Sequence, residues 1–530
     1  MEALRSSGRV APPSITAIVF ILLATLVPIA LQKPMLNSDG DLARHLRHGQ
    51  YMLEHGELIR ADPFSFTRPG APFIGFEYGS QLLYALAERA GGLPAVAILA
   101  GLLIALTYAL LTSFLLNRRV DPLLACVTIA LAITLGAEHW TARPHLFSSL
   151  AVVILLAMLE RGSRKGAALT AAVLFVVWAN LHGGFVYGWI LTALYLGGSL
   201  GELIWGSDRA VWRERVRYYG AMLVSSVLAT LLNPHGLELH RHLLGFFGKP
   251  FLRDNTAEFA SPNFHEPTGK VFLAVMLVCL LSLTLHRRRP TLPRLFVICA
   301  GIAFALIAVR NIPLFGLTAL PVLALHLDEL WRRLPDPGGV RGRFETTARS
   351  TATLPWMIPA VLLMVTVALG RGRLGSAQLI RNEFDPTVFP VAAVSRARDH
   401  ELKGRLYHEF AWGGYLLYAW PEQRIYIDGG TDFFGEDLFR EYSMIKGMAP
   451  GWRDRLRARD ISLVLLRRES PLSHQVARDG TWSMWYCDSV AVVFRRWDPA
   501  DRERGRVNPA EDELNACARH TLTALRHRDE

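Results

Sequence analysis

The sequence predicts a polytopic α-helical membrane bundle of about 11 spanning helices, followed by a smaller α/β domain outside the membrane. The first reason is composition, because 51% of the 530 residues are hydrophobic and the mean hydropathy is +0.24. These values are too apolar for an ordinary soluble protein and are typical of membrane proteins. The second reason is distribution, because long apolar runs end near residue 371 and shorter mixed runs follow.

Eleven apolar runs are candidates for membrane-spanning helices. A helix needs roughly 20 residues to cross about 30 Å of hydrocarbon, so the shorter runs must tilt or be shielded by neighbours. A polar break at 180–184 separates the fifth run from the sixth. The runs are 13–32, 93–116, 122–138, 146–160, 167–180, 184–205, 217–233, 270–286, 292–309, 312–328 and 354–371.

Clustered arginines orient the bundle, because short cytoplasmic loops carry an excess of basic residues. This rule places the N-terminus in the cytoplasm and the chain after about residue 372 outside, in a multi-pass membrane protein. The same clusters account for most of the net charge of +11, so we predict no nucleic-acid partner. The clusters lie at 5–9, 118–119, 161–165, 209–217, 287–289 and 332–333.

The chain divides into three parts. They are the bundle 1–371 with its first outer loop 33–92, the outer α/β domain 372–500 and the charged tail 501–530. Within the loop, residues 41–55 place leucines at helical spacing among basic residues, which is typical of a helix on the membrane surface. In the outer domain we expect strands at 405–407, 415–418, 424–427, 462–466 and 490–494, and helices at 436–446 and 451–459.

The unusual polar residues gather in the loops predicted to lie outside. Asp39 and Asp41 follow the first span. Two carboxylates this close can share a divalent cation, such as Mg²⁺ or Mn²⁺, or act as a base beside a second charge. The alternative is that one of them caps the surface helix, because Asp is a favoured N-cap residue. The two roles can coexist.

Two arginines are candidates for binding an anion. Arg143 precedes His145 after the third span, and Arg310 precedes Asn311 between the ninth and tenth spans. A guanidinium group presents a rigid fork of donors that matches a phosphate. The alternative is an interfacial arginine whose side chain extends to lipid headgroups.

His182 lies in the break at 180–184 and could act as a general acid or bind phosphate, or simply serve as a hinge. Together with His139, His145 and His235 it matches no compact metal-ligand spacing. Asp428 follows an expected strand, where it is equally consistent with a site residue and with a turn.

Three further groups have a structural and a functional interpretation. Glu258, His265 and Glu266 are ordinary loop residues or line an acceptor groove, and the first interpretation is favoured. The aromatic residues at 412–420 pack in a core or stack on sugars, and packing is favoured. Cys487 and Cys517 both fall outside and are able to pair, although their spacing does not require it.

An acidic pair after the first span, followed by a surface helix, resembles the first outer loop of the GT-C superfamily of membrane glycosyltransferases. The chain is more closely similar to a bacterial branch of that superfamily, which implies a location in a bacterial inner membrane. Similar short motifs occur in order along nearly the whole chain. They are DGDLARHLRHG (39–49), EHGELIRADPFSFT (54–67), ARPHLFS (142–148), WANLHGGF (178–185), LNPHG (232–236), RNIPL (310–314), WGGYL (412–416) and IDGGTDFFG (427–435).

The resemblance implies transfer of a hexosyl or pentosyl unit from a polyprenyl-phosphate carrier, among membrane lipids, to a glycan, lipid or protein acceptor. Asp39 or Asp41 takes the place of the family's first-loop acid, which would orient or deprotonate the acceptor with or without a metal. Arg143 and Arg310 would hold the departing phosphate. The segment 410–415 is similar to an oligosaccharyltransferase signature but lacks its aspartate, so acceptor recognition is not transferred to it.

Two other classes of function fit the same topology. A transporter or flippase of lipid-linked sugar would place polar residues at mid-membrane depth in paired broken helices. Here, apart from the break at 180–184, they lie at the outer boundary, which favours an enzyme. A non-catalytic scaffold of the cell envelope would tolerate replacement of Asp39 and Asp41, whereas an enzyme would not.

Overall fold

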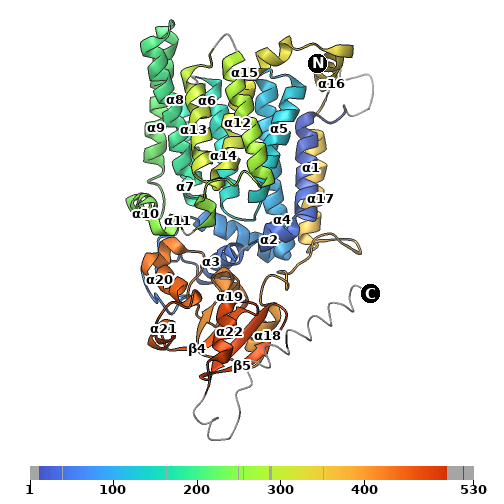
Figure 1. The fold of residues 1–530 in the computed structure, drawn as a ribbon. Coiled ribbons are helices and arrows are strands. Elements are labelled where there is room, and N and C mark those ends of the chain that lie inside the picture. The colour runs from blue at the N-terminus through green and yellow to red at the C-terminus, as the bar shows by residue number, and fades with distance from the viewer. Residues whose placement is uncertain are drawn as a thin grey trace.

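A computed structural model describes residues 11–38, 40–162, 165–248, 250–254, 256–285, 289–349, 351–497 and 517. Each apolar run predicted to span the membrane corresponds to a helix, or to a pair of short helices, that runs alongside its neighbours (Figure 1). The helices are α1 (Ile15–Ala30), α4 (Tyr78–Asn117), α5 (Pro122–Gly136), α6 (His145–Arg161), α7 (Ala167–Leu181), α8 (Phe185–Trp205), α9 (Arg209–Ala229), α12 (Pro267–Leu285), α13 (Leu292–Ile307), α14 (Ile312–Leu317) with α15 (Ala319–Arg333), and α17 (Leu354–Leu369).

By length and composition, three helices in the described part of the chain are able to cross a membrane. A fourth joins them if the bent pair Val309–Leu317 and Ala319–Arg333 is one span. Several of the others have 15 to 17 residues and are shorter than a bilayer requires. The count of eleven spans therefore remains a prediction, whereas the membrane bundle itself is clear.

Short elements cover the two ends of the bundle. On the side of the smaller domain lie α2 (Gln32–Asn37), α3 (Asp41–His55), α10 (Leu237–Phe247), α11 (Pro250–Asp254) and a hairpin of β1 (Arg373–Leu374) and β2 (Ala377–Gln378); α16 (Val340–Arg349) lies at the opposite end (Figure 1). Helix α4 breaks at Gly91 and Gly92, where Gly92 has φ +68°, a conformation that glycine adopts readily. Its spanning part therefore begins near residue 93, as the hydropathy predicts.

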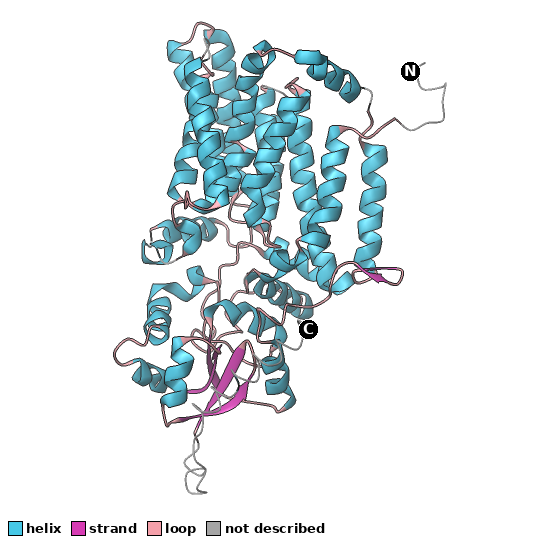
Figure 2. Ribbon diagram, turned by 45° about the vertical axis from the view of Figure 1, so that its right-hand side comes forward, coloured by secondary structure: helices cyan, strands magenta, loops and turns pink. Residues whose placement is uncertain are grey.

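The smaller domain contains a four-stranded sheet with helices around it (Figure 2). The strand order is β3–β4–β6–β5, with β3 parallel to β4 and the other pairs antiparallel. Its strands are β3 (Arg405–His408), β4 (Ile461–Arg467), β5 (Trp482–Cys487) and β6 (Ala491–Arg496), and its helices are α18 (Val391–Asp399), α19 (Gly413–Ala419), α20 (Thr431–Lys446), α21 (Trp452–Ala458) and α22 (Pro471–Arg478). A disulfide joins Cys487 to Cys517.

Two strand predictions in this domain are wrong. Residues 415–418 belong to the helix α19, because a short apolar run is compatible with a buried helix as well as a buried strand. Residues 424–427 form no strand, and Ile425 makes only an isolated bridge to Ser65 of the first outer loop. Both segments are used to attach the domain to that loop.

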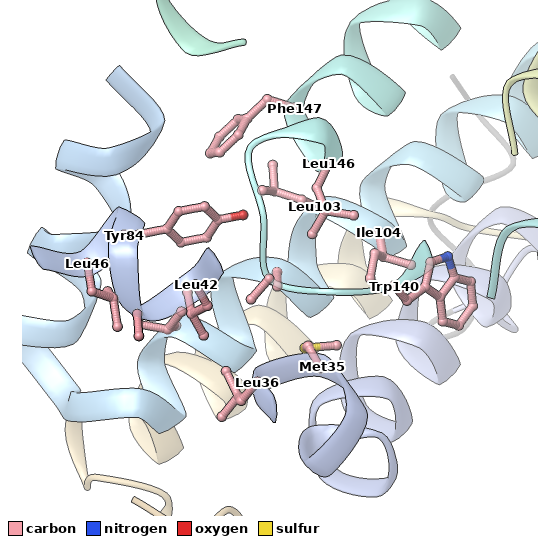
Figure 3. Packing of buried hydrophobic residues seen from close by; sticks show 14 of the residues in the cluster. Met35, Leu36, Leu42, Leu46, Tyr84, Leu103, Ile104, Trp140, Leu146 and Phe147 are labelled. Carbon is pink, nitrogen blue, oxygen red and sulfur yellow. The ribbon is translucent and has the colours of Figure 1, made fainter. Parts of the chain in front are cut away.

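Helix α3 lies between the bundle and the smaller domain. Leu42 and Leu46 on one side pack with Tyr84 of α4 in a buried cluster that also contains residues of α2 and α6 (Figure 3). On the other side the backbones of α3 and α19 touch, because a Cβ on Gly414 would overlap the carbonyl oxygen of Gly40. This packing holds the start of α3 in a fixed place at the junction.

Candidate functional site

A cavity of about 1210 Å³ lies where the bundle, the first outer loop and the smaller domain meet. Its lining combines apolar residues of the bundle helices with charged residues of the loops and of the smaller domain. The apolar lining includes Ile104, Val152, Ile190, Phe304 and Leu317; the polar lining includes Asp41, Arg44, Glu77, Arg143, His182, Glu258, Arg310, Asp428 and Asp432.

Asp41 is the first residue of α3, and two arginines hold its carboxylate. Arg143 Nη2 lies 2.6 Å from Oδ2, and Arg44 Nη2 lies 3.6 Å from Oδ1. Burial would raise the pKa of Asp41, but the charges of Arg143 and Arg44 outweigh it, so the pKa is lowered and the carboxylate stays ionised. Asp41 thus fixes the guanidinium of Arg143 in the cavity.

Arg143 and Arg310 converge on a single carboxylate. Arg143 Nη1 lies 2.9 Å from Oε1 of Glu258, and Arg310 Nη1 lies 3.8 Å from Oε2. The Arg310 guanidinium also lies over the ring of Phe259, 4.7 Å from its centroid. Burial lowers the pKa of Arg310. The negative charge of Glu258 raises this pKa by less, so the pKa stays below its ordinary value. Two cations from distant loops therefore face the space that one anionic side chain occupies.

His182 ends α7 with an extended backbone, and its imidazole points into the cavity lining. Its Nδ1 lies 2.7 Å from Ser148 Oγ and accepts from the backbone N–H of Gly184 at 3.1 Å. The Ser148 hydroxyl in turn accepts a hydrogen bond from Trp178 Nε1 at 2.7 Å. The break at 180–184 is therefore an ordered junction that orients one imidazole.

Glu77 is a cavity residue that the sequence argument missed. It directly precedes α4, and its side chain is 12% exposed between His45 and His182. Burial raises the pKa of this carboxyl to about 7. The signal available in the sequence was the location of Glu77 at the predicted membrane boundary. A carboxylate there costs free energy unless it is paired or hydrated.

The smaller domain contributes carboxylates next to the start of α3. Asp428 is 4% exposed, accepts a hydrogen bond from Gly430 N at 2.7 Å, and burial raises its pKa to about 6. Asp432 Oδ2 lies 2.9 Å from His242 Nε2 of α10. A Cβ on Gly429 would overlap Asp41 Oδ1, so the backbone of this domain closes directly onto the site.

The remaining predicted residues have defined places. His145 Nε2 and Asn311 Nδ2 line the cavity but bond to backbone oxygens, those of His139 at 2.7 Å and Phe304 at 2.9 Å. Asp39 lies outside the described residues. Trp412, Tyr415 and Trp420 are buried in the core of the smaller domain, Tyr418 is half-buried, and His265 and Glu266 are exposed.

The divalent metal expected at Asp39 and Asp41 has no matching ligand set in the described part of the chain. No group of three or more His, Cys, Asp or Glu residues there could hold a metal ion. The oxygens of Asp41 face guanidinium groups instead. A cation at Asp41 would have to displace Arg143, so we route no chemical step through a metal.

No family model matches the chain, and no curated protein matches its sequence. Solved structures do match. The AglB oligosaccharyltransferase of Archaeoglobus fulgidus, in complex with an inhibitory peptide and a dolichol-phosphate, has a TM-score of 0.54 at 12% identity over 91% of this chain and 74% of that one. AglB tethered with an acceptor peptide has a TM-score of 0.54 at 14% identity over 91% and 73%.

ArnT of Cupriavidus metallidurans, bound to undecaprenyl phosphate, matches at 14% identity with a TM-score of 0.48 over 91% of this chain and 98% of that one. Identities this low bear on the fold alone. The AglB matches show that the chain shares the fold of this archaeal oligosaccharyltransferase, in agreement with the fold that the resemblance of its motifs led us to expect.

Proposed function

We propose that the protein is a membrane glycosyltransferase that moves a sugar from a polyprenyl-phosphate carrier to an acceptor on the extracytoplasmic face. The observation that carries this proposal is the convergence of Arg143 and Arg310 on one anion-sized position, the carboxylate of Glu258. The same cavity is also lined by apolar residues of the bundle helices. A lipid phosphate needs both a pair of cations and an apolar path for its chain.

In the proposed reaction an acceptor hydroxyl or amine attacks the anomeric carbon of the sugar. The bond from that carbon to the phosphate oxygen breaks, and the electron pair leaves with the polyprenyl phosphate. Arg143 and Arg310 stabilise the negative charge that develops on the leaving group, which is where a site with fixed cations gains most. Asp41 positions Arg143 through their ion pair.

Two features support the extracytoplasmic placement. The disulfide between Cys487 and Cys517 belongs to the smaller domain, and disulfides persist in oxidising compartments. The predicted topology puts that domain outside the inner membrane, on the same side as the cavity. In AglB the bound lipid is a dolichol-phosphate, and we transfer only the class, a polyprenyl phosphate, to this chain.

The test is mass spectrometry of the lipids that co-purify with the wild-type protein and with Arg143→Ala and Arg310→Ala. Arg89→Ala is the matched control, because Arg89 is an exposed arginine of α4 that does not line the cavity. We expect a polyprenyl-phosphate sugar with the wild type and the control, and its loss from both cavity variants. Bulk phospholipid alone in all four samples would refute the proposed donor and leave a scaffold as the better account.

A further inference from the structure

The carboxyl group of Glu77 lies between two imidazoles with opposite hydrogen-bonding demands. Oε1 is 3.9 Å from His182 Nε2, and Oε2 is 3.5 Å from His45 Nδ1. Both separations are longer than a hydrogen bond, and catalytic hydrogen bonds often tighten only in the complex with substrate. Glu77 also lines the cavity that holds Asp41 and Arg143.

Beside Oε1 of Glu77, the imidazole of His182 presents a hydrogen-bond donor. Gly184 N–H donates to Nδ1 of His182, so that nitrogen is an acceptor and carries no proton. A neutral imidazole with an unprotonated Nδ1 carries its proton on Nε2. The proton-bearing Nε2 of His182 is thus the atom 3.9 Å from Oε1 of Glu77, and a donor at this place favours the ionised carboxylate.

Beside Oε2 of Glu77, the imidazole of His45 presents a hydrogen-bond acceptor. Gln81 Nε2 lies 3.3 Å from Nδ1 of His45, and an amide NH₂ group can only donate. Nδ1 of His45 is therefore unprotonated. Oε2 of Glu77 faces this lone pair, which is unfavourable for a carboxylate but suits a protonated carboxyl that donates a hydrogen bond. The surroundings thus accommodate Glu77 in both protonation states.

The surroundings of Asp41, unlike those of Glu77, favour only one protonation state. The two oxygens of Asp41 face Arg143 and Arg44, whose positive charges favour the ionised form. A base held so firmly as an anion is a weak proton acceptor. The arrangement suits Asp41 for positioning Arg143 and leaves the proton of the acceptor to another group.

We propose that Glu77 is the general base of the transfer reaction, an inference that rests on the proposed glycosyltransferase function. As the acceptor oxygen or nitrogen bonds to the anomeric carbon and the carrier phosphate departs, the acceptor's proton passes to Oε2 of Glu77. The protonated carboxyl then donates to Nδ1 of His45, and release of the proton to solvent resets the site.

The acidity of Glu77 agrees with this role. Burial raises its pKa to about 7, near the pH at which a base is most effective. The titratable and charged groups that face it are His45, Arg44 and Asp41 of α3, Arg143 before α6, His182 between α7 and α8, and Asp432 of α20. Arg44 and Arg143 lower the pKa, while Asp432 and Asp41 raise it.

The experiment compares wild type, Glu77→Gln, Glu77→Asp and the control Glu88→Gln, a carboxylate on the same helix that bonds to Gln50 and Tyr418 away from the cavity. Each protein is reconstituted with native membrane lipid and envelope extract, and release of free polyprenyl phosphate is followed by mass spectrometry across pH. Binding of undecaprenyl phosphate and infrared spectra of the carboxyl groups are measured on the same samples.

We expect E77Q to release polyprenyl phosphate about 10²–10⁴ times more slowly, the usual contribution of a general base, with undecaprenyl phosphate binding unchanged. E77D retains part of the activity and E88Q all of it. The wild-type rate rises as pH passes about 7, together with loss of an infrared band of protonated carboxyl that E77Q lacks.

Wild-type release rates in E77Q, or the same titrating band in E77Q, would overturn the assignment of Glu77 while leaving the proposed function intact. No release by the wild type under any condition, with the infrared band still assigned to Glu77, would instead overturn the proposed function and the catalytic role with it.

Discussion

At the scale of single residues, the partners of each carboxylate separate their roles. Asp41 and Glu258 face arginines, which lower their pKa values against the effect of burial and keep both groups ionised. Glu77 lies between imidazoles, and burial raises its pKa to about 7. Glu258 is the more unexpected of the two ionised groups, because it occupies the position where the proposed phosphate would bind.

Replacing Glu258 should therefore strengthen binding of the carrier. Glu258→Gln removes a negative charge that competes with phosphate for Arg143 and Arg310. We expect undecaprenyl phosphate to bind several-fold tighter, up to about tenfold for about 1.4 kcal/mol of relieved competition. Titration of the purified protein with this lipid measures the effect, with Glu266→Gln of the same loop as the exposed control. Weaker binding by E258Q would show that Glu258 contacts the ligand.

The pKa of Glu77 also predicts a dependence of stability on pH. Its ordinary value of 4.5 rises to about 7 in the folded protein, so the folded state binds the extra proton between these values. Its contribution is present below about pH 4.5 and is lost as pH rises through about 7, a difference of order 3 kcal/mol. E77Q should thus unfold at a higher temperature than wild type at about pH 8 but not at about pH 5. If the unfolding temperatures of E77Q and wild type differed equally at the two pH values, the burial of Glu77 would be contradicted.

The sequence predicted which loops supply the site but not how its charges pair. Asp41, Arg143, His182 and Arg310 line one cavity because the membrane gathers their loops at one face. Glu258 was underrated as an ordinary loop residue, because its partners are 115 and 52 positions away and no local pattern marks such contacts.

At the scale of elements, α3 connects the two halves of the molecule. It packs on α4 through leucines and on α19 through backbone contact at Gly40 and Gly414. Amphipathic spacing was enough to predict this helix, since its period is local. The identity of α19 as a helix was not predictable from a short apolar run, because only its packing against α3 decides between helix and strand.

A methyl group at the α3–α19 contact should disturb the site from a distance. In Gly414→Ala the new Cβ would overlap Gly40 O and lie 3.0 Å from Arg44 Cβ, so the two helices must separate. We expect a loss of about 1–3 kcal/mol in stability together with most of the transfer activity. Thermal unfolding and the release assay check this. The control is Gly245→Ala in α10, where a Cβ meets nothing within 4 Å; an equal effect in both variants would refute the account.

At the scale of the whole molecule, one face of the membrane bundle carries the cavity and the smaller domain closes it. The arginine-rich loops predict a position of that domain outside the cytoplasm, and the disulfide is consistent with this prediction. Apolar length alone could not settle the number of spans, because packing inside the bundle shields helices that are too short by themselves.

Thiol counting tests this topology. Cys126, Cys279 and Cys299 are free, whereas Cys487 and Cys517 are paired. Alkylation of the unfolded protein should label three thiols without reductant and five with it. Five labelled thiols in both samples, from protein isolated without reductant, would contradict an oxidising location for the smaller domain.

Arg143 and Arg310 are proposed to bind a lipid phosphate in the cavity that apolar residues of the bundle also line. The most direct measurement is an electron cryomicroscopy structure of the protein with added undecaprenyl phosphate. The account predicts phosphate density within hydrogen-bonding distance of both guanidinium groups, with Glu258 displaced and the lipid chain beside Val152, Ile190 and Phe304. Phosphate density elsewhere, or an unchanged Glu258 bridge at saturating lipid, would contradict it.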